Sequence, residues 1–245
     1  FSDVEPKRLT EAGVSAGKAL MEYRTRLMSN KNSWCVVSVP TPAWAHKVFP
    51  DVSADQAMER LWAEILKAVR ISAEEDPISA WMNHIDHLQK ITEFLNAHDF
   101  AELHYTNCLG TDLHVELPPG HIWMGGAEQS AAGHLFAANI PTEEVYTLPQ
   151  RNGVNGIVAA SKPLHYNGTL IHDFTLTFRD GKVVDYTARK GGEQLKELLE
   201  TDEGASFLGE VALVPHTSPI SQSGILFYNT LFDENASCHL ALGKA

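Results

Sequence analysis

The sequence predicts a mixed α+β protein, and a change of texture near residue 100 supports this prediction. Before that point, apolar residues recur at helical spacing around one short β-prone run. After it, β-prone runs follow one another, separated by Gly, Asp and Asn. We therefore expect residues 1–100 to be the C-terminal portion of an α/β domain and residues 101–245 to be mainly antiparallel β.

The first expected elements are a helix and a strand. Residues 10–28 carry apolar side chains at roughly helical spacing and end at the polar run 29–33, which predicts a helix followed by a loop. Residues 34–39, Trp-Cys-Val-Val-Ser-Val, form a nearly continuous β-prone run closed by Pro40. Such a run is typical of a strand buried on both faces of a parallel sheet.

Two further helices are expected before residue 100. Ser53 and Gln56 have the spacing of a capping box, and the apolar residues after them recur on one face. A second helix is expected to follow Pro77. Its inward residues are predicted to be Ile78, Trp81, Met82, Ile85, Leu88, Phe94 and Leu95.

The second half of the chain predicts antiparallel pairing. Runs at 103–105, 113–117, 169–178 and 183–188 are β-prone. Asp180-Gly181 lies between the last two, and an Asp-Gly pair between such runs is a strong hairpin signal. One more helix is expected at 193–199.

Composition narrows the class of protein. The formal charge of −12 over 245 residues disfavours nonspecific binding to nucleic acid or anionic membranes, which depends on clustered Lys and Arg. The apolar runs fall short of the roughly 20 residues that span a bilayer. Cys35, Cys108 and Cys238 are odd in number and widely spaced, so we expect core thiols in a reducing, cytoplasmic compartment.

Two glutamates occupy unusual surroundings. Glu144 lies in Asn-Ile-Pro-Thr-Glu-Glu-Val-Tyr-Thr at 139–147, and Glu210 lies in Phe-Leu-Gly-Glu-Val-Ala-Leu-Val-Pro at 207–215. A carboxylate in an apolar run usually has a positive partner, because burying the ionised group alone is costly. The partner is either a metal ion, with His239 as a further ligand, or a basic side chain such as Arg189 or Lys190.

Other signals are weaker. His84 and His87 are three residues apart on the polar side of the expected second helix, which predicts an exposed pair rather than a metal site. The sequence lacks His-Glu-x-x-His, Gly-x-Ser-x-Gly and a phosphate loop, which removes the commonest zincins, the α/β-hydrolases and the nucleotide hydrolases.

Four long motifs resemble one protein family. They are Trp-Cys-Val-Val-Ser-Val-Pro-Thr-Pro-Ala-Trp-Ala at 34–45, Gly-Thr-Asp-Leu at 110–113, the run at 139–147, and residues 218–239 from Ser-Pro-Ile-Ser to Ala-Ser-Cys-His. Together they resemble the M29 metallo-aminopeptidases, the aminopeptidase T, AmpS and PepS group, along essentially the whole chain.

The resemblance implies a metal-dependent aminopeptidase that releases N-terminal residues from short peptides. It places metal ligands on Glu144, Glu210 and His239, for two divalent ions of Zn, Co or Mn, which activate a water. Glu143, beside the first ligand, is the candidate general acid or base. The resemblance also implies a homodimer, for which apolar residues 226–228 and 231–232 are candidate contacts unless they belong to the core.

The resemblance further implies that the family's chains extend beyond both ends of this sequence, and that a Tyr, a His and an Asp complete the site later. If the polypeptide ended at Ala245, we expect that it would be incomplete at its C-terminus, without a fully occupied pair of metals, and inactive. Two alternatives stay open. One is a non-catalytic metal-binding or dimerisation module. The other is a glycosidase that uses Glu144 and Glu210 as a carboxylate pair without metal.

Overall fold

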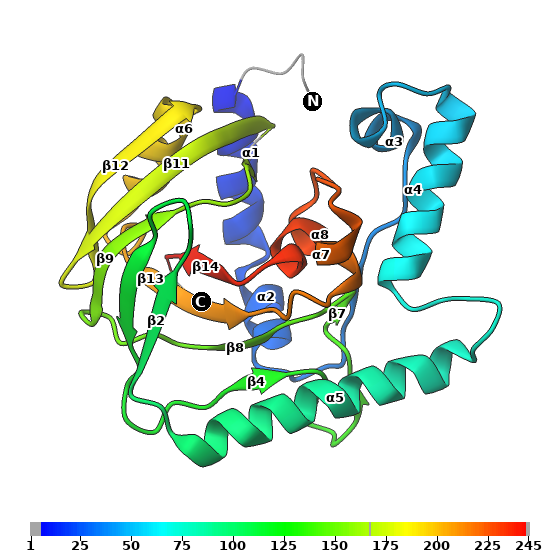
Figure 1. Ribbon diagram of the computed structural model, residues 1–245, viewed down its shortest axis with the longest axis horizontal. Helices are drawn as coiled ribbons and strands as arrows, with labels where there is room; N and C mark the ends of the chain where they lie inside the picture. The colour runs from blue at the N-terminus through cyan, green and yellow to red at the C-terminus, as the bar shows by residue number, and fades with distance from the viewer. Residues whose placement is uncertain (1–5, 167, 244–245) are drawn as a thin grey trace. The chain divides into compact units, whose positions relative to one another are not determined.

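A computed structural model describes residues 6–166 and 168–243 (Figure 1). Its helices and strands form a mixed α+β fold, as the sequence predicts. The residues group into two compact units, one of 1–37 with 127–140 and one of 38–126 with 141–245. These units differ from the division near residue 100, which stays a prediction about the domains of the intact protein.

The first unit holds two helices and short strands. The helices are α1 (Pro6–Ala19) and α2 (Met21–Met28), so the helix expected at 10–28 is present but broken near Leu20. Strand β1 (Val36–Val37) pairs in parallel with β7 (Asn139–Ile140), and β5 (Glu128–Gln129) pairs with β6 (Leu135–Phe136).

The strand expected at 34–39 is parallel, but its predicted length and burial are wrong. It has two residues, and Val36 and Val37 are 44% and 58% exposed. Pairing with β7 over two residues satisfies backbone hydrogen bonds but does not cover the faces of the strand, so its side chains stay exposed. Cys35, Cys108 and Cys238 are also exposed, so they are not the core residues that we expected.

Three helices begin the second unit. They are α3 (Pro42–Val48), α4 (Ala54–Ala68) and α5 (Pro77–His98). The capping box of Ser53 and Gln56 is present at the start of α4. In α5, Leu88 and Leu95 are buried as expected, whereas Ile78, Met82 and Phe94 are more than half exposed.

The remaining helices and strands complete this unit. The strands of its larger sheet are β2 (Glu102–Thr106), β3 (Asp112–Glu116), β9 (Val154–Ala159), β10 (Leu164–Tyr166), β11 (Thr169–Arg179) and β12 (Lys182–Lys190). The smaller sheet contains β4 (Met124–Gly125), β8 (Val145–Thr147), β13 (Leu208–Leu213) and β14 (His239–Leu242). The helices are α6 (Gly192–Leu199), α7 (Pro219–Ser223), α8 (Thr230–Asp233) and the 3₁₀ turn η1 (Glu234–Ala236).

The larger sheet has the neighbour order β10-β11-β9-β3-β2, with β12 also paired to β11. All its pairs are antiparallel, as expected. The Asp180-Gly181 turn joins β11 and β12 with φ positive at both residues, as a two-residue hairpin of type I′ requires. A Cβ at Gly181 would lie 1.8 Å from the Arg151 carbonyl oxygen, so glycine is needed there.

The smaller sheet runs in the order β14-β13-β8-β4, with all pairs antiparallel. In Figure 1, β13 lies between β14 and β8. Ala212, in β13, is the register partner of both His239 and Tyr146. Because side chains alternate between faces, Glu210, His239 and the residue two positions before Tyr146, Glu144, belong to one face.

The core lies between these sheets and helices α5 and α6. It contains Leu88, Leu113, Trp123, Ile171 and Leu195, each at most 2% exposed. The apolar segments 226–228 and 231–232 join buried packing as well: Phe227 is 1% exposed and stacks on Phe232 at 4.9 Å between ring centroids. Leu231 and Phe232 are also buried, whereas Leu226 and Tyr228 are partly exposed, so a dimer contact through this segment stays a prediction.

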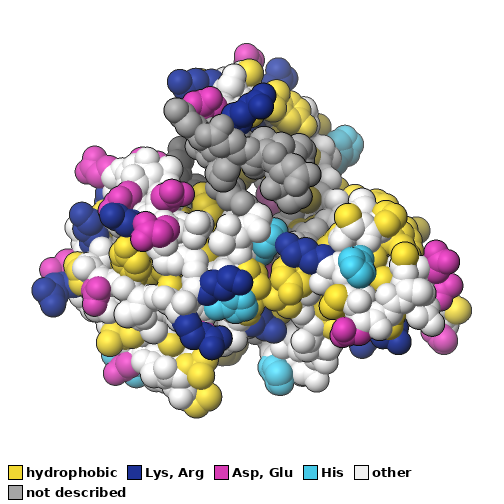
Figure 2. All heavy atoms as spheres, turned by 90° about the horizontal axis from the view of Figure 1, so that it is seen from above, with side chains coloured by type: hydrophobic (Ala, Val, Ile, Leu, Met, Phe, Trp, Pro, Cys, Tyr) yellow, Lys and Arg dark blue, Asp and Glu magenta, His cyan; other side chains and the backbone are white. Residues whose placement is uncertain are grey.

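The surface carries mixed charge. On the face seen in Figure 2, acidic and basic side chains are interspersed with hydrophobic ones. Within residues 6–166 and 168–243, no helix combines the length and apolar character needed to cross a membrane.

Candidate metal site

Glu144, Glu210 and His239 come together in the structure, although they are far apart in the sequence. Glu210 lies in β13, His239 begins β14, and Glu144 directly precedes β8. The His239 Nε2 atom is 2.9 Å from Glu144 Oε2 and 3.9 Å from Glu210 Oε1. The imidazole therefore lies against both carboxylates.

The bulge in β13 helps to aim Glu210. The register with β14 shifts between Leu208 and Glu210, where Gly209 adds one residue to the strand. Such a bulge bends the strand and redirects the side chains that follow. Gly125 in β4 allows that strand to approach the backbone of Glu144 closely, since a Cβ at Gly125 would lie 2.7 Å from the Glu144 carbonyl oxygen.

Glu234 is a third carboxylate at this place. It lies in η1, and its charge interacts with those of Glu144, Glu210 and His239. Burial, followed by the repulsion from Glu144, raises the pKa of Glu234 to about 7. We call Glu144, Glu210, Glu234 and His239 the acidic cluster.

The other members of the acidic cluster respond to the same crowding. Burial, and then the Glu144 carboxylate, raise the pKa of Glu210. Burial lowers the pKa of His239, but the adjacent Glu144 carboxylate outweighs burial and raises that pKa to about 9. Three carboxylates thus share one imidazolium, which leaves the cluster short of positive charge.

The acidic cluster has the donor set of a metal site, although the ligand atoms of Glu144, Glu210 and His239 do not all lie within 4.8 Å of one another. The His239 Nδ1 atom lies 3.2 Å from the Ser237 carbonyl oxygen, which can only accept, so Nδ1 carries a proton and Nε2 faces the carboxylates. Glu144 Oε2 lies 2.9 Å from Nε2 and, apart from this ion pair with His239, the buried oxygen has no hydrogen-bond partner among the described residues. Carboxylate and imidazole donors without a thiolate suit Zn, Co or Mn. The residues therefore fit a divalent metal.

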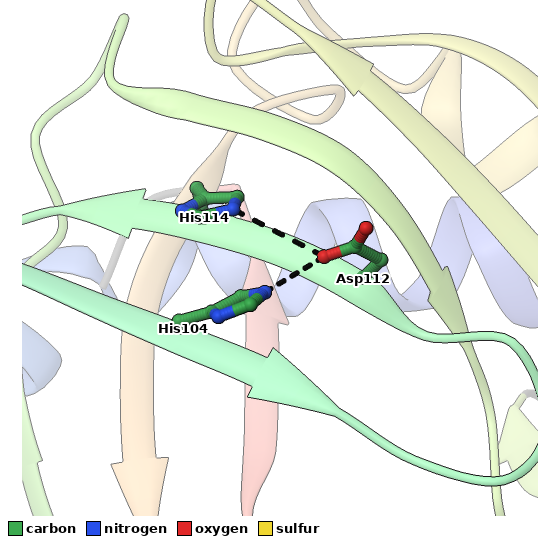
Figure 3. Close-up of side chains that lie close together, drawn as sticks. All are labelled: His104, Asp112 and His114. Atoms are coloured by element: carbon green, nitrogen blue, oxygen red, sulfur yellow. Dashed lines mark hydrogen bonds and ion pairs between the residues drawn. The ribbon is translucent and has the colours of Figure 1, made fainter.

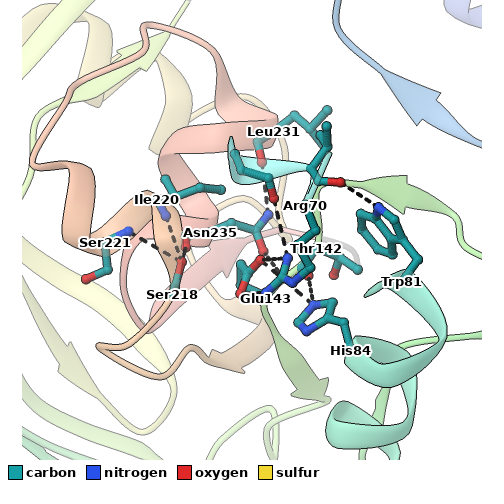
Figure 4. Close-up of polar contacts among 12 residues, drawn as sticks. Arg70, Trp81, His84, Thr142, Glu143, Ser218, Ile220, Ser221, Leu231 and Asn235 are labelled. Atoms are coloured by element: carbon teal, nitrogen blue, oxygen red, sulfur yellow. Dashed lines mark hydrogen bonds and ion pairs between the residues drawn. The ribbon is translucent and has the colours of Figure 1, made fainter. Parts of the chain in front are cut away.

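Glu143 points away from the acidic cluster, as expected for the neighbour of Glu144. Both its carboxylate oxygens accept from Arg70, with Arg70 Nη2 2.8 Å from Oε2. The Glu143 side chain is 2% exposed, and its backbone N–H donates to Asn235 Oδ1 at 2.6 Å. Figure 4 shows Arg70, His84 and Asn235 gathered around Glu143.

His84 belongs to the same group, and its expected exposure is wrong. It is 8% exposed, and its Nε2–H donates to the Thr142 carbonyl oxygen at 2.7 Å. Burial lowers the pKa of His84, which favours the neutral ring. We call Arg70, His84, Glu143 and Asn235 the Arg70 cluster.

Arg189, one of the two basic partners considered from the sequence, is engaged elsewhere. Arg189 Nε pairs with Asp173 at 2.6 Å, on the hairpin of β11 and β12. The basic side chain that reaches residues 143–144 is Arg70, and it pairs with Glu143 rather than with Glu144.

Arg70, Glu234 and Asn235 were missed from the sequence. Glu234 had a visible signal, an acid five residues before His239 and inside the motif at 218–239. Arg70 had none, since it is 73 residues from Glu143 and its backbone adopts a left-handed conformation, with φ of 56°, just after α4.

Comparison with known proteins gives consistent results. The family model for thermophilic metalloprotease (M29) matches residues 1–245. Aminopeptidase 2 of Geobacillus stearothermophilus is 54% identical over 245 residues, which cover all of this chain and 59% of that protein. Aminopeptidase AmpS of Bacillus subtilis (strain 168) is 53% identical, over 99% of this chain and 58% of that protein.

The fold has a solved counterpart. Wild-type AmpT from Thermus thermophilus superimposes with a TM-score of 0.93 at 41% identity, over 99% of this chain and 59% of that one. The chain therefore spans less than two thirds of the length of these relatives.

Proposed function

The chain belongs to the M29 family of metalloproteases, and from this premise we propose that the intact protein is a metal-dependent aminopeptidase whose acidic cluster holds its metal. The observation that carries the proposal is the arrangement of Glu144, Glu210 and His239 on one face of the smaller sheet. The relatives are named aminopeptidases, which favours neither the glycosidase nor the non-catalytic module.

In the proposed site, Glu144, Glu210 and His239 hold two divalent ions of Zn, Co or Mn. When bound, such ions polarise a carbonyl group and lower the pKa of a water. Glu234 adds a further carboxylate beside these ligands. The Ser237 carbonyl oxygen accepts a hydrogen bond from Nδ1–H of His239, which leaves Nε2 as the nitrogen that can bind a metal.

We assign Glu143 a positioning role in place of the expected general acid or base. Its carboxylate is fully engaged by Arg70, and it has no free oxygen directed at the acidic cluster. Its backbone N–H is held by Asn235, the residue next to Glu234. Glu143 therefore ties the segment that carries Glu144 to the turn that carries Glu234.

Short peptides are the proposed substrates, and a homodimer is the proposed assembly. Both rest on the family resemblance alone, since residues 226–228 and 231–232 contribute to internal packing. A cytoplasmic location likewise stays a prediction.

The test is metal-dependent hydrolysis by the intact protein. Aminoacyl p-nitroanilides and short peptides are offered before and after treatment with EDTA. We expect release of N-terminal residues, loss of activity with the chelator, and recovery with Zn²⁺, Co²⁺ or Mn²⁺. Full activity in the chelator would contradict the proposal, as would cleavage of peptides with a blocked N-terminus at the same rate.

A further inference from the structure

A second group of potential metal ligands lies on the larger sheet, on the hairpin of β2 and β3. Figure 3 shows His104, Asp112 and His114 on neighbouring strands. His104 and His114 are direct register partners, and Asp112 is two residues before His114. The three side chains are exposed on one face, while Leu113 and Val115, the alternate residues of β3, are buried on the other.

The ligand atoms converge. His104 Nε2 is 2.7 Å from Asp112 Oδ1, and His114 Nε2 is 4.0 Å from the same oxygen. One ligand atom from each residue lies within 4.8 Å of the other two, and no other group of three His, Cys, Asp or Glu among the described residues meets this criterion. The imidazole rings are stacked at 4.0 Å between centroids with their planes 13° apart, so a rotation of one ring would direct both Nε2 atoms at a shared ion.

Glu102 fixes the orientation of His114. Its Oε1 lies 2.8 Å from His114 Nδ1, and a carboxylate oxygen can only accept a hydrogen bond. Nδ1 therefore carries the proton, which leaves the Nε2 lone pair of a neutral ring directed toward Asp112 and His104. A carboxylate behind a ligating imidazole is the usual partner that holds it for a metal.

Ordinary surface ion pairs are the alternative to a metal site. Such pairs account for His104 with Asp112 and for His114 with Glu102. An ion pair also joins His114 Nε2 to Asp112, but at 4.0 Å it is beyond hydrogen-bond distance. The observation that favours a metal is that the Nε2 atoms of both rings approach the same Asp112 oxygen.

We propose that His104, Asp112 and His114 bind one Zn²⁺ or a similar first-row divalent cation, with Glu102 positioning His114. Two imidazoles and one carboxylate suit Zn, Cu and Ni, and water completes the coordination at an exposed site. The ion joins β2, the edge strand of the larger sheet, to β3. This site is separate from the acidic cluster and does not depend on the proposed peptidase activity.

The test is a Zn²⁺ titration of the intact protein, with metal content measured after dialysis and the imidazole nitrogens followed by long-range ¹H–¹⁵N NMR. It is run at about pH 8, because metal binding needs neutral imidazoles and Glu102 raises the pKa of His114. We expect the Nε2 resonances of His104 and His114 to shift together at one equivalent. We also expect the double variant His104→Ala, His114→Ala to hold one Zn²⁺ fewer per chain, with unchanged peptidase activity.

Two single substitutions sharpen this test. Glu102→Gln should weaken binding at the hairpin by about 10- to 100-fold, as loss of a carboxylate behind a ligand does. Glu116→Gln is the matched control: it removes the same charge from the same face, opposite Glu102, and should leave binding unchanged. Unshifted Nε2 resonances in the wild-type protein would overturn the proposal. So would an equal effect of the two glutamate substitutions, which would indicate only diffuse attraction to an acidic surface.

Discussion

The Arg70 cluster and the acidic cluster lie on opposite sides of one dipeptide, yet their charges are balanced very differently. Glu143 is matched by a bidentate guanidinium and supported by Asn235. Glu144, the next residue, meets two further carboxylates and a single imidazole. The first cluster is electrostatically complete as it stands. The second lacks positive charge, which a divalent metal would supply.

This contrast separates two uses of a buried carboxylate. A paired carboxylate fixes the position of the chain, and its removal should be felt mainly in stability. A carboxylate that faces other carboxylates is unfavourable without a cation, so it is expected where a cation binds. The following predictions test that separation.

The largest effect is expected from Glu144→Gln and Glu210→Gln. Gln keeps the shape of the side chain but removes the charge that a metal needs. We expect metal affinity and peptidase rate to fall by more than about a hundredfold. This exceeds the 10- to 100-fold loss that is typical when a residue that only positions a metal ligand is replaced. Metal content and kinetics of the intact protein check this. Glu143→Gln is the neighbouring control, and we expect a smaller loss of metal affinity and rate. A larger loss in Glu143→Gln than in Glu144→Gln would contradict the contrast between the two clusters.

Arg70→Met should mainly reduce stability. It leaves Glu143 buried without its partner, which typically costs about 3–5 kcal/mol. Urea denaturation measures the loss. The double variant Arg70→Met, Glu143→Leu should regain most of it, because a buried ion pair replaced by apolar groups is often tolerated. A double variant as unstable as Arg70→Met would show that the ion pair is not the cause.

Asn235→Ala should affect both clusters, because Asn235 joins them. Its Oδ1 accepts from Glu143 N–H, and its Nδ2 donates to the Leu231 carbonyl. Leaving these buried groups unpaired should cost about 1–3 kcal/mol. We also expect metal affinity to fall by about 10- to 100-fold, as for other residues that hold ligands in place.

Asn229→Ala is the control for that variant. Asn229 caps α8 through Leu231 N–H, so the substitution should lower stability while metal affinity is kept. Equal losses of affinity in the two variants would show that Asn235 has no special role in joining the clusters.

The last variant test concerns the pH dependence of the metal-free protein. The pKa of Glu234 rises from 4.5 to about 7, and that of His239 from 6.5 to about 9. A raised pKa in the folded state stabilises the fold below the ordinary value, and this contribution is lost as pH rises through the raised value. The Tm of the metal-free protein should therefore fall between about pH 4.5 and 9, most of all from these two groups. Glu234→Gln should flatten the lower part of that fall, and a Tm that rises across the window would contradict the assignment.

Local patterns in the sequence predicted much of the fold. The capping box at Ser53, the helix after Pro77 and the Asp180-Gly181 hairpin depend on residues close together in the chain, and all are present. The predicted burial of the strand at 34–39 was wrong because burial depends on what covers a strand, which the residues of the strand do not encode. Similarly, His84 lies on the polar side of its helix but is covered by Thr142 and Glu143 from a distant segment.

The candidate site was predictable where residues lie within long motifs. The motifs contain Glu144 and His239, the resemblance implied Glu210 outside them, and strand register places all three residues on one face. The separation of Glu143 from Glu144 also followed from the alternation of side chains. Arg70 could not be predicted, because its contact with Glu143 depends on how α4 packs and on a left-handed backbone at its end.

The central claim is that the acidic cluster binds divalent metal, and anomalous diffraction from crystals of the intact protein grown with Zn²⁺ tests it most directly. Bound Zn²⁺ should give anomalous density at bonding distance, about 2.0–2.2 Å, from oxygens of Glu144 and Glu210 and from Nε2 of His239. Glu143 should remain paired with Arg70 in the same crystals. Full Zn²⁺ loading with no anomalous density at these atoms, and with His239 still paired to Glu144, would contradict the account.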